Sequence, residues 1–119
     1  MIRSVNKKYT RNIKILGDLN KAYPFPSSDI DKNVHKYLGE INAESINDAI
    51  KYLEDGDAKN LGKLMTKVQE SFDKHMIPAC PKELTVSLLH YALDYENINR
   101  LTYGGKGVGS QGDGTIQFL

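Results

Sequence analysis

The stretch from Gly104 to Leu119 reads GGKGVGSQGDGTIQFL, and it decides which class of fold the sequence predicts. Six of the ten glycines in the chain lie within it. A glycine gives up roughly 0.5–1 kcal/mol more than alanine on folding. This density therefore indicates backbone angles that other residues avoid, or a close approach to the main chain. Residues 98–103 and 115–119 look extended, so the segment predicts two strands joined by a glycine-rich turn.

Working back from this hairpin, the sequence predicts four or five helices. Apolar residues recur at helical spacing in each, and the clearest set is Ile46, Ala49, Ile50 and Leu53. Gly56 suits the left-handed position after a helix, and Asp57 suits the cap of the next one. The first expected helix covers 8–21, the third covers 45–54 and the fifth covers 84–94. The second is capped by Ser28 or Asp29 and reaches Ile41, although Gly39 makes its end uncertain. The fourth begins after Asp57 and ends at the break formed by Pro78 and Pro81.

These elements predict one α+β domain over residues 1–119, predominantly helical with a small antiparallel sheet. A chain of 119 residues is long enough for one modest core. No apolar run approaches the roughly 20 residues of a membrane span.

The charge and the cysteine content limit the kinds of partner and the cellular compartment that we expect for this protein. The formal net charge is +1 with basic and acidic residues interleaved, which does not favour a nucleic-acid partner. Met1 to Arg11 lacks the apolar region of a secretory signal. Cys80 is the single cysteine and cannot form an internal disulfide, so we expect a reducing, cytoplasmic setting.

The glycine-rich turn has a possible chemistry of its own. Exposed amides in such a loop can bind an anion, most often a phosphate, and Lys106 adds a positive charge. The turn has neither the Walker pattern nor a strand–loop–helix dinucleotide fingerprint. From spacing alone, a hairpin with a long turn is the favoured interpretation.

The residues that precede the glycine-rich turn, together with the turn itself, resemble a known family. Gly56 to Met65 reads GDAKNLGKLM, and the hairpin follows after one further helix. The segment from Asp57 to Leu119 resembles the C-terminal domain of the GHMP kinases, whose third motif commonly reads G-A-K-L-T-G-A-G-G-G-G before an apolar strand. Residues 6–55 resemble that domain more loosely.

The resemblance implies a ferredoxin-like C-terminal domain of an ATP- and Mg²⁺-dependent small-molecule kinase. Its acceptor would be a small alcohol or phosphate. A sugar kinase, galactokinase-like or heptose-kinase-like, is preferred to a mevalonate kinase because DLNKAYPF at 18–25 looks more like the sugar-kinase relatives. The third motif would shape the nucleotide or acceptor site. The residues that it would supply are Gly104, Gly105, Lys106, Gly109, Ser110, Gln111, Gly112, Asp113 and Gly114.

The sequence also departs from the family. Gln111 and Asp113 stand where the family most often has glycine, and the motif P-x-x-x-G-L-S-S-S/A of its N-terminal domain does not occur. The sheet also looks truncated. We therefore expect an N-terminal kinase domain as partner, no kinase activity from this chain alone, and self-association through bare apolar faces and open strand edges. No catalytic residue is assigned.

Several residues outside the glycine-rich turn are also candidate site residues. His35, His75, His90 and Cys80 have no zinc-like spacing, so separate structural roles are expected and no metal ligand is assigned. Asp94 and Glu96 could face the acceptor, although a solvated helix end explains them better. Tyr103 is the aromatic residue best placed to line a ligand pocket. Two alternatives stay open: a free-standing binding or oligomerisation module, and a helical protein with an accidental glycine-rich tail.

Overall fold

The computed structural model describes residues 15, 17, 19–20, 25–109, 111 and 114–119. The helix expected over 8–21 lies mostly outside the described residues, but Ile15, Gly17, Leu19 and Asn20 have helical backbone.

The first long arm of the fold is an almost unbroken helical run. It comprises α2 (Asp29–Lys36), the π-helical turn η1 (Tyr37–Ile41) and α3 (Asn42–Glu54). Ser28 caps α2, its hydroxyl accepting a hydrogen bond from the Asp31 amide at 3.1 Å. The end considered at Gly39 is not observed, because η1 carries the helix through this glycine into α3. The π turn accommodates it without breaking the run.

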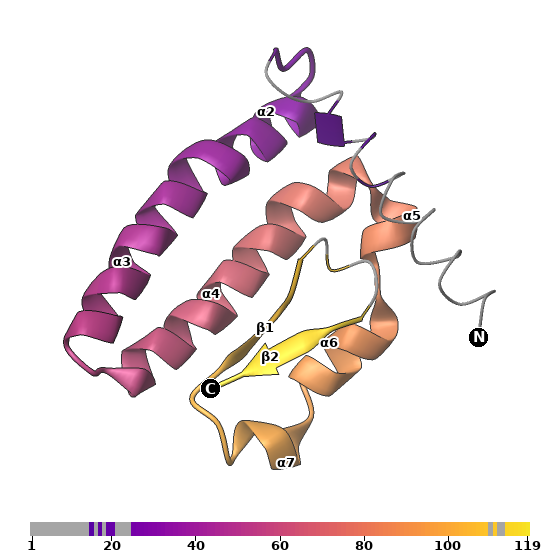
Figure 1. Ribbon diagram of the computed structural model, residues 1–119. Coiled ribbons are helices and arrows are strands. Elements are labelled where there is room, and N and C mark those ends of the chain that lie inside the picture. The colour runs from indigo at the N-terminus through magenta and orange to yellow at the C-terminus, as the bar shows by residue number, and fades with distance from the viewer. Residues whose placement is uncertain (1–14, 16, 18, 21–24, 110, 112–113) are drawn as a thin grey trace, which may run out of the picture.

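The second arm is α4 (Ala58–Met76), which runs antiparallel to α3 (Figure 1). Its start confirms the predicted signals. Gly56 has a φ of 66°, and the Asp57 carboxylate accepts a hydrogen bond from the Asn60 amide at 3.0 Å. This bond and a second from the Asn60 side chain hold the pKa of Asp57 below its usual value. The helix ends at the 3₁₀ turn η2 (Ile77–Ala79), where Pro78 follows it.

The segment after α4 differs from the prediction of one helix over 84–94. It forms α5 (Pro81–Leu84) and α6 (Ser87–Leu93), separated by Thr85 and Val86. Thr85 leaves helical geometry at φ −77° and ψ 75°, and the Val86 amide turns back to the Leu84 carbonyl at 2.9 Å. The break lets α6 take its own direction toward the hairpin.

The hairpin is present, but its first strand is displaced from the predicted position. Residues 98–103 are not extended: α7 (Glu96–Asn99) and a turn occupy this region. The strand β1 (Gly105–Gly107) begins within the glycines themselves and pairs antiparallel with β2 (Ile116–Phe118). In the register of this pair, Gly105 faces Phe118 and Gly107 faces Ile116.

Close packing explains why glycine forms this strand. A Cβ on Gly105 would lie 2.7 Å from Cε1 of Phe118, inside van der Waals contact. The expectation of an extended 98–103 was wrong because local hydrogen bonds hold this segment in a short helix and turn, among them the bond from the Leu101 amide to the Ile98 carbonyl at 2.9 Å. The Thr102 hydroxyl donates to the Ile98 carbonyl at 3.1 Å and stabilises this turn.

The main core lies at one end of the molecule, away from the sheet. Phe72 and Met76 from the end of α4 meet Val34 and Tyr37 from the first arm. The rings of Tyr37 and Phe72 pack edge to face with centroids 5.6 Å apart. The other buried members of this cluster are Ile15, Cys80 and Leu84.

The arrangement is layered (Figure 1). The arm of α2, η1 and α3 lies on one side of α4, and the hairpin and α6 lie on the other. The described residues therefore form a mostly helical α+β fold with a two-stranded antiparallel sheet. No helix among them is both long and apolar enough to cross a membrane.

Candidate functional site

One face of α4 supplies the site. Gly62, Thr66, Gln69 and Asp73 recur at intervals of four, three and four residues, so they share one side of the helix. This side meets the glycine strand. The Gly105 amide donates to the Thr66 hydroxyl at 3.3 Å, and the Gly107 amide donates to the Gln69 side-chain oxygen at 2.6 Å. The strand is thus held to the helix by side chains that accept from its backbone.

Two glycines set how closely the helix and the strand approach. A Cβ on Gly104 would lie 2.6 Å from the carbonyl carbon of Gly62. A Cβ on Gly62 would lie 2.7 Å from the carbonyl carbon of Tyr103. Both neighbours are backbone atoms, which cannot move aside as a flexible side chain can. The hairpin is therefore an integral part of the fold, packed backbone to backbone on α4.

Gln69 and Gln111 form a buried polar contact beneath the turn. Each is only 5% exposed, and the Gln69 amide nitrogen donates to the Gln111 side-chain oxygen at 2.7 Å. Gln111 has a φ of 61°, the left-handed region that favours glycine. Its side chain also fills the space beside Gly107, where a Cβ would lie 2.6 Å from Oε1. Gln111 thus holds the turn onto the helix.

Asp73 and His90 continue this chain of polar contacts. The second hydrogen of the Gln69 amide reaches Asp73 Oδ1 at 2.8 Å, and His90 Nε2 lies 2.9 Å from Asp73 Oδ2. The other ring nitrogen, Nδ1, lies 2.9 Å from the Val86 carbonyl oxygen. Since a carbonyl oxygen only accepts, Nδ1 donates, and an ionised Asp73 makes Nε2 a donor too. Both contacts are satisfied together only by the imidazolium form.

The pKa of His90 follows from this geometry. Desolvation lowers it, but the hydrogen bonds to the Val86 carbonyl and to Asp73 outweigh that effect, with added attraction from the charges of Asp73 and Asp94. The net direction is a raised pKa, which favours the charged ring.

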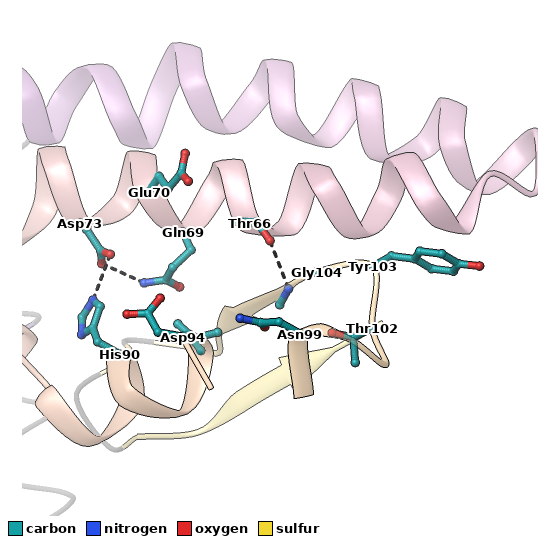
Figure 2. Close-up of a pocket in the computed structure, with 12 residues that line it drawn as sticks. Thr66, Gln69, Glu70, Asp73, His90, Asp94, Asn99, Thr102, Tyr103 and Gly104 are labelled. Atoms are coloured by element: carbon teal, nitrogen blue, oxygen red, sulfur yellow. Dashed lines mark hydrogen bonds and ion pairs between the residues drawn. The ribbon is translucent and has the colours of Figure 1, made fainter. Parts of the chain in front are cut away.

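A polar cleft opens beside these residues (Figure 2). Its volume is about 270 Å³, and Figure 2 shows Gln69, Asp73, His90 and Asp94 facing one another across it. The carboxylates of Asp73 and Asp94 point toward it, together with hydroxyl and amide groups and one edge of the glycine strand. The lining residues are Thr66, Gln69, Glu70, Asp73, His90, Leu93, Asp94, Asn99, Thr102, Tyr103, Gly104 and Gly105.

The residues predicted from the motif occupy different positions, and only some of them line the cleft. Gly104 and Gly105 line the cleft, whereas Lys106 does not: its amine donates to the Gly107 carbonyl at 2.9 Å, and desolvation lowers its pKa. Gly109 and Gly114 have φ values of 65° and 77°, as turn glycines do. Ser110, Gly112 and Asp113 lie outside the described residues.

The amides of the described turn are not presented as an anion cradle. Those of Gly105 and Gly107 donate to α4, Val108 donates to the Thr115 carbonyl at 3.0 Å, and Gln111 donates to the Val108 carbonyl at 3.2 Å. These four groups would have to break existing bonds to hold a phosphate. The described part of the turn is therefore shaped for packing on α4.

The other candidate residues have local partners. His75 Nδ1 lies 2.8 Å from the Ser71 carbonyl, and the buried Cys80 thiol donates to Glu83 at 3.2 Å. In the part of the chain that the structure describes, no three His, Cys, Asp or Glu side chains gather as metal ligands would. Glu96 pairs with Arg100 on α7, whereas Asp94 lines the cleft. Tyr103 lines it as predicted.

Sequence reasoning missed the contribution of α4. Thr66, Gln69 and Asp73 were not singled out, and His90 was considered only as a metal ligand. A signal was present: in a helix with a clear apolar stripe, these polar residues form a second stripe at helical spacing. Such a stripe is typical of a solvated face, and only the position of the hairpin shows that it is covered.

No protein-family model, curated protein or solved structure matches this chain.

Proposed function

We propose that the chain is the C-terminal part of an ATP-dependent small-molecule kinase of the GHMP type and forms the acceptor-side wall of its active site. One observation carries the proposal. The two stretches that resemble the family, Gly56 to Met65 and Gly104 to Leu119, pack on each other through Gly62 and Gly104. If the resemblance of either stretch to the family were accidental, the two stretches would not be expected to pack on each other.

The position of the cleft fits this assignment. It lies where the first glycines of the hairpin meet α4, and it presents side chains that can orient a small acceptor, among them Asp94 and Tyr103. Phosphoryl transfer depends mainly on positioning and on stabilising charge. In this proposal the chain contributes positioning: the glycines allow close approach of the backbone, and the side chains of α4 and α6 hold the acceptor.

ATP and Mg²⁺ do not fit the described residues of this chain by themselves. The amides of Gly105, Gly107, Val108 and Gln111 are engaged internally, and no cluster of metal-ligand side chains is found among the described residues. When bound, ATP would supply the transferred phosphoryl group and Mg²⁺ would neutralise its charge. We assign their binding to a nucleotide-binding domain that carries the P-x-x-x-G-L-S-S-S/A motif, and we place the whole enzyme in the cytoplasm.

The first test is the genomic DNA upstream of this coding sequence. We expect it to encode the P-x-x-x-G-L-S-S-S/A motif, in frame or after a frameshift. An unrelated upstream region together with a genuine start at Met1 would favour the alternative, a free-standing α+β module that binds a partner or forms oligomers.

The second test is enzymatic. In a coupled ADP-release assay over a panel of sugars and mevalonate, we expect the 119-residue chain alone to match the blank without enzyme. The polypeptide that also contains the nucleotide-binding domain should release ADP with at least one acceptor. Turnover by the chain alone clearly above the blank would overturn the division of roles proposed here.

A further inference from the structure

Two rows of charged residues, one on each long helical arm, mirror each other in sign. Both rows have the same intervals of four, four, three and four positions, and at each of their five positions the two rows carry opposite charges. The acidic row, on η1 and α3 and ending at the residue after α3, is Glu40, Glu44, Asp48, Lys51 and Asp55. The basic row, on α4, is Lys59, Lys63, Lys67, Glu70 and Lys74.

Each row forms one line along its arm. Residues three or four positions apart share one side of a helix, and a step of four positions advances along the axis by about 6 Å. All ten side chains are exposed. The two rows are therefore available to a partner, and their charges recur at matching distances.

The charges of the two rows are not neutralised within the part of the chain that the structure describes. The ion pairs found there involve none of the ten residues. This holds although α3 and α4 lie side by side (Figure 1). The first three members of each row are like charges four positions apart, an arrangement that destabilises a helix. A surface of opposite charge would remove this repulsion.

The presence of both signs identifies the kind of partner. A nucleic acid or an anionic lipid surface would attract the basic row but would be repelled by the acidic row on the neighbouring helix. A partner that matches both rows must itself carry a basic row and an acidic row with the same spacing. A second copy of this chain carries both.

We infer that a second copy of this chain docks on these two helices, with the acidic row of one copy against the basic row of the other. Glu44 and Lys63 are the middle members of the two runs of three like charges, so they meet whether the two helices run parallel or antiparallel. Exposed ion pairs are individually weak and are screened by salt, so the contact has low affinity and depends on ionic strength. This inference is independent of the proposed function, because copies can associate whether or not the chain is part of a kinase.

The first test is sedimentation equilibrium of the 119-residue chain over a range of protein and salt concentrations. We expect the association constant to fall about tenfold between about 50 mM and about 500 mM salt, because screening shortens the reach of each charge. A strict monomer at the lower salt concentration, up to the solubility limit of the protein, would overturn the inference. An association constant that is unchanged or raised by salt would also overturn it and would indicate contact through exposed apolar residues such as Ile46 and Ile50.

Exchanging one pair of charges makes the test specific. Lys63→Glu should weaken self-association about tenfold, because it sets a second carboxylate against Glu44 of the other copy, and Glu44→Lys should do the same with two ammonium groups. An equal mixture of the two variants should regain the wild-type affinity, because the introduced carboxylate then faces the introduced ammonium group. Lys82→Glu, the same charge change at an exposed position of α5, is the matched control and should weaken association far less.

Recovery in the mixture distinguishes a specific contact from a change in net charge or in folding. Weakening by either variant without recovery in the mixture would overturn the inference. Circular dichroism of each variant should match that of the wild type, since both positions are exposed.

Cross-linking tests the contact itself. In an equal mixture of ¹⁴N-labelled and ¹⁵N-labelled chain, a carbodiimide should join the Glu44 carboxylate of one copy to the Lys63 amine of the other. Mass spectrometry should then find this peptide pair with one peptide of each label. If Glu44 and Lys63 are joined only in pairs of a single label, the contact lies within one molecule and the inference is wrong.

Discussion

At the scale of single residues, glycines 62 and 104 fix the distance between α4 and the hairpin. Each would place a Cβ inside contact distance of the other segment's backbone, so neither site has room for a side chain. Gly39 offers a contrast, since a Cβ there would meet nothing within 4 Å. Glycine is therefore required for close packing at positions 62 and 104, whereas position 39 has room for a side chain.

We predict that Gly104→Ala lowers the free energy of unfolding by about 3 kcal/mol, because the backbone contact must open to admit the methyl group. Gly39→Ala, the matched control, should raise it by about 0.5–1 kcal/mol because alanine favours the helix. Urea unfolding followed by circular dichroism measures both. Equal stability of the two variants would show that the hairpin does not pack on α4 as described.

Gln111 combines an unfavourable backbone angle with a favourable side-chain contact. Its φ of 61° costs a residue other than glycine roughly 1–2 kcal/mol, and its hydrogen bond with Gln69 offsets part of this. We predict that Gln111→Gly stays close to the wild-type stability, since relief at the backbone replaces the lost bond. Gln111→Ala loses the bond and keeps the strain, so it should be less stable than Gln111→Gly by about 1 kcal/mol. A more stable alanine variant in the same urea experiment would contradict the left-handed conformation.

At the scale of elements, the pair of Asp73 and His90 joins α4 to α6. The raised pKa of His90 gives this contact a pH dependence with a definite sign. The contribution is complete below the unfolded pKa of about 6.5 and is lost as the pH rises through the higher folded value. Both side chains are about 30% exposed, at 33% and 28%, so solvent screening keeps the contribution below about 1 kcal/mol.

We therefore predict that His90→Gln destabilises the protein more at about pH 5.5 than at about pH 8.5. Urea unfolding of the variant and the wild type at both pH values gives the two differences. The same comparison in an Asp73→Asn background, which removes the carboxylate that pairs with His90, is the control and should show a smaller change with pH. A His90→Gln effect that grows with pH would mean that His90 is neutral in the folded protein.

At the scale of the whole molecule, the exposed apolar residues of α3 matter most. Ile46, Ile50 and Leu53 lie at intervals of four and three residues and are 49%, 49% and 65% exposed. They form one stripe on a helix whose other side packs on α4. Burying such a stripe yields roughly 25 cal/mol per Å² of apolar surface.

For the 119-residue chain on its own, we predict self-association that involves this stripe. Light scattering at micromolar concentrations should report a mass above the monomer that falls on dilution. Leu53→Lys should shift the population toward the monomer, whereas Asn47→Lys, an exposed position beside the stripe, should shift it far less. A strict monomer at every concentration would contradict the prediction.

Features that depend only on neighbouring residues along the chain could be predicted from the sequence. Gly56 and Asp57 mark the boundary between α3 and α4 because the left-handed turn and the helix cap involve only a few consecutive residues. The apolar periodicity of α4 and the position of β2 followed in the same way. The class of fold and the place of Tyr103 at a cleft were also predictable at this level.

The remaining features depend on contacts between residues that are distant in the sequence. The first strand was predicted at 98–103 but is formed by the glycines, because Gly104 packs against α4 and Gly105 packs against Phe118. No local sequence pattern reveals these contacts. The bonds that build the site join residues 17, 38 and 42 positions apart: His90 with Asp73, Gly107 with Gln69, and Gln111 with Gln69. Polar residues on a helix are typical of a solvated face. It is the close approach of a glycine backbone that turns this face into one side of a cleft.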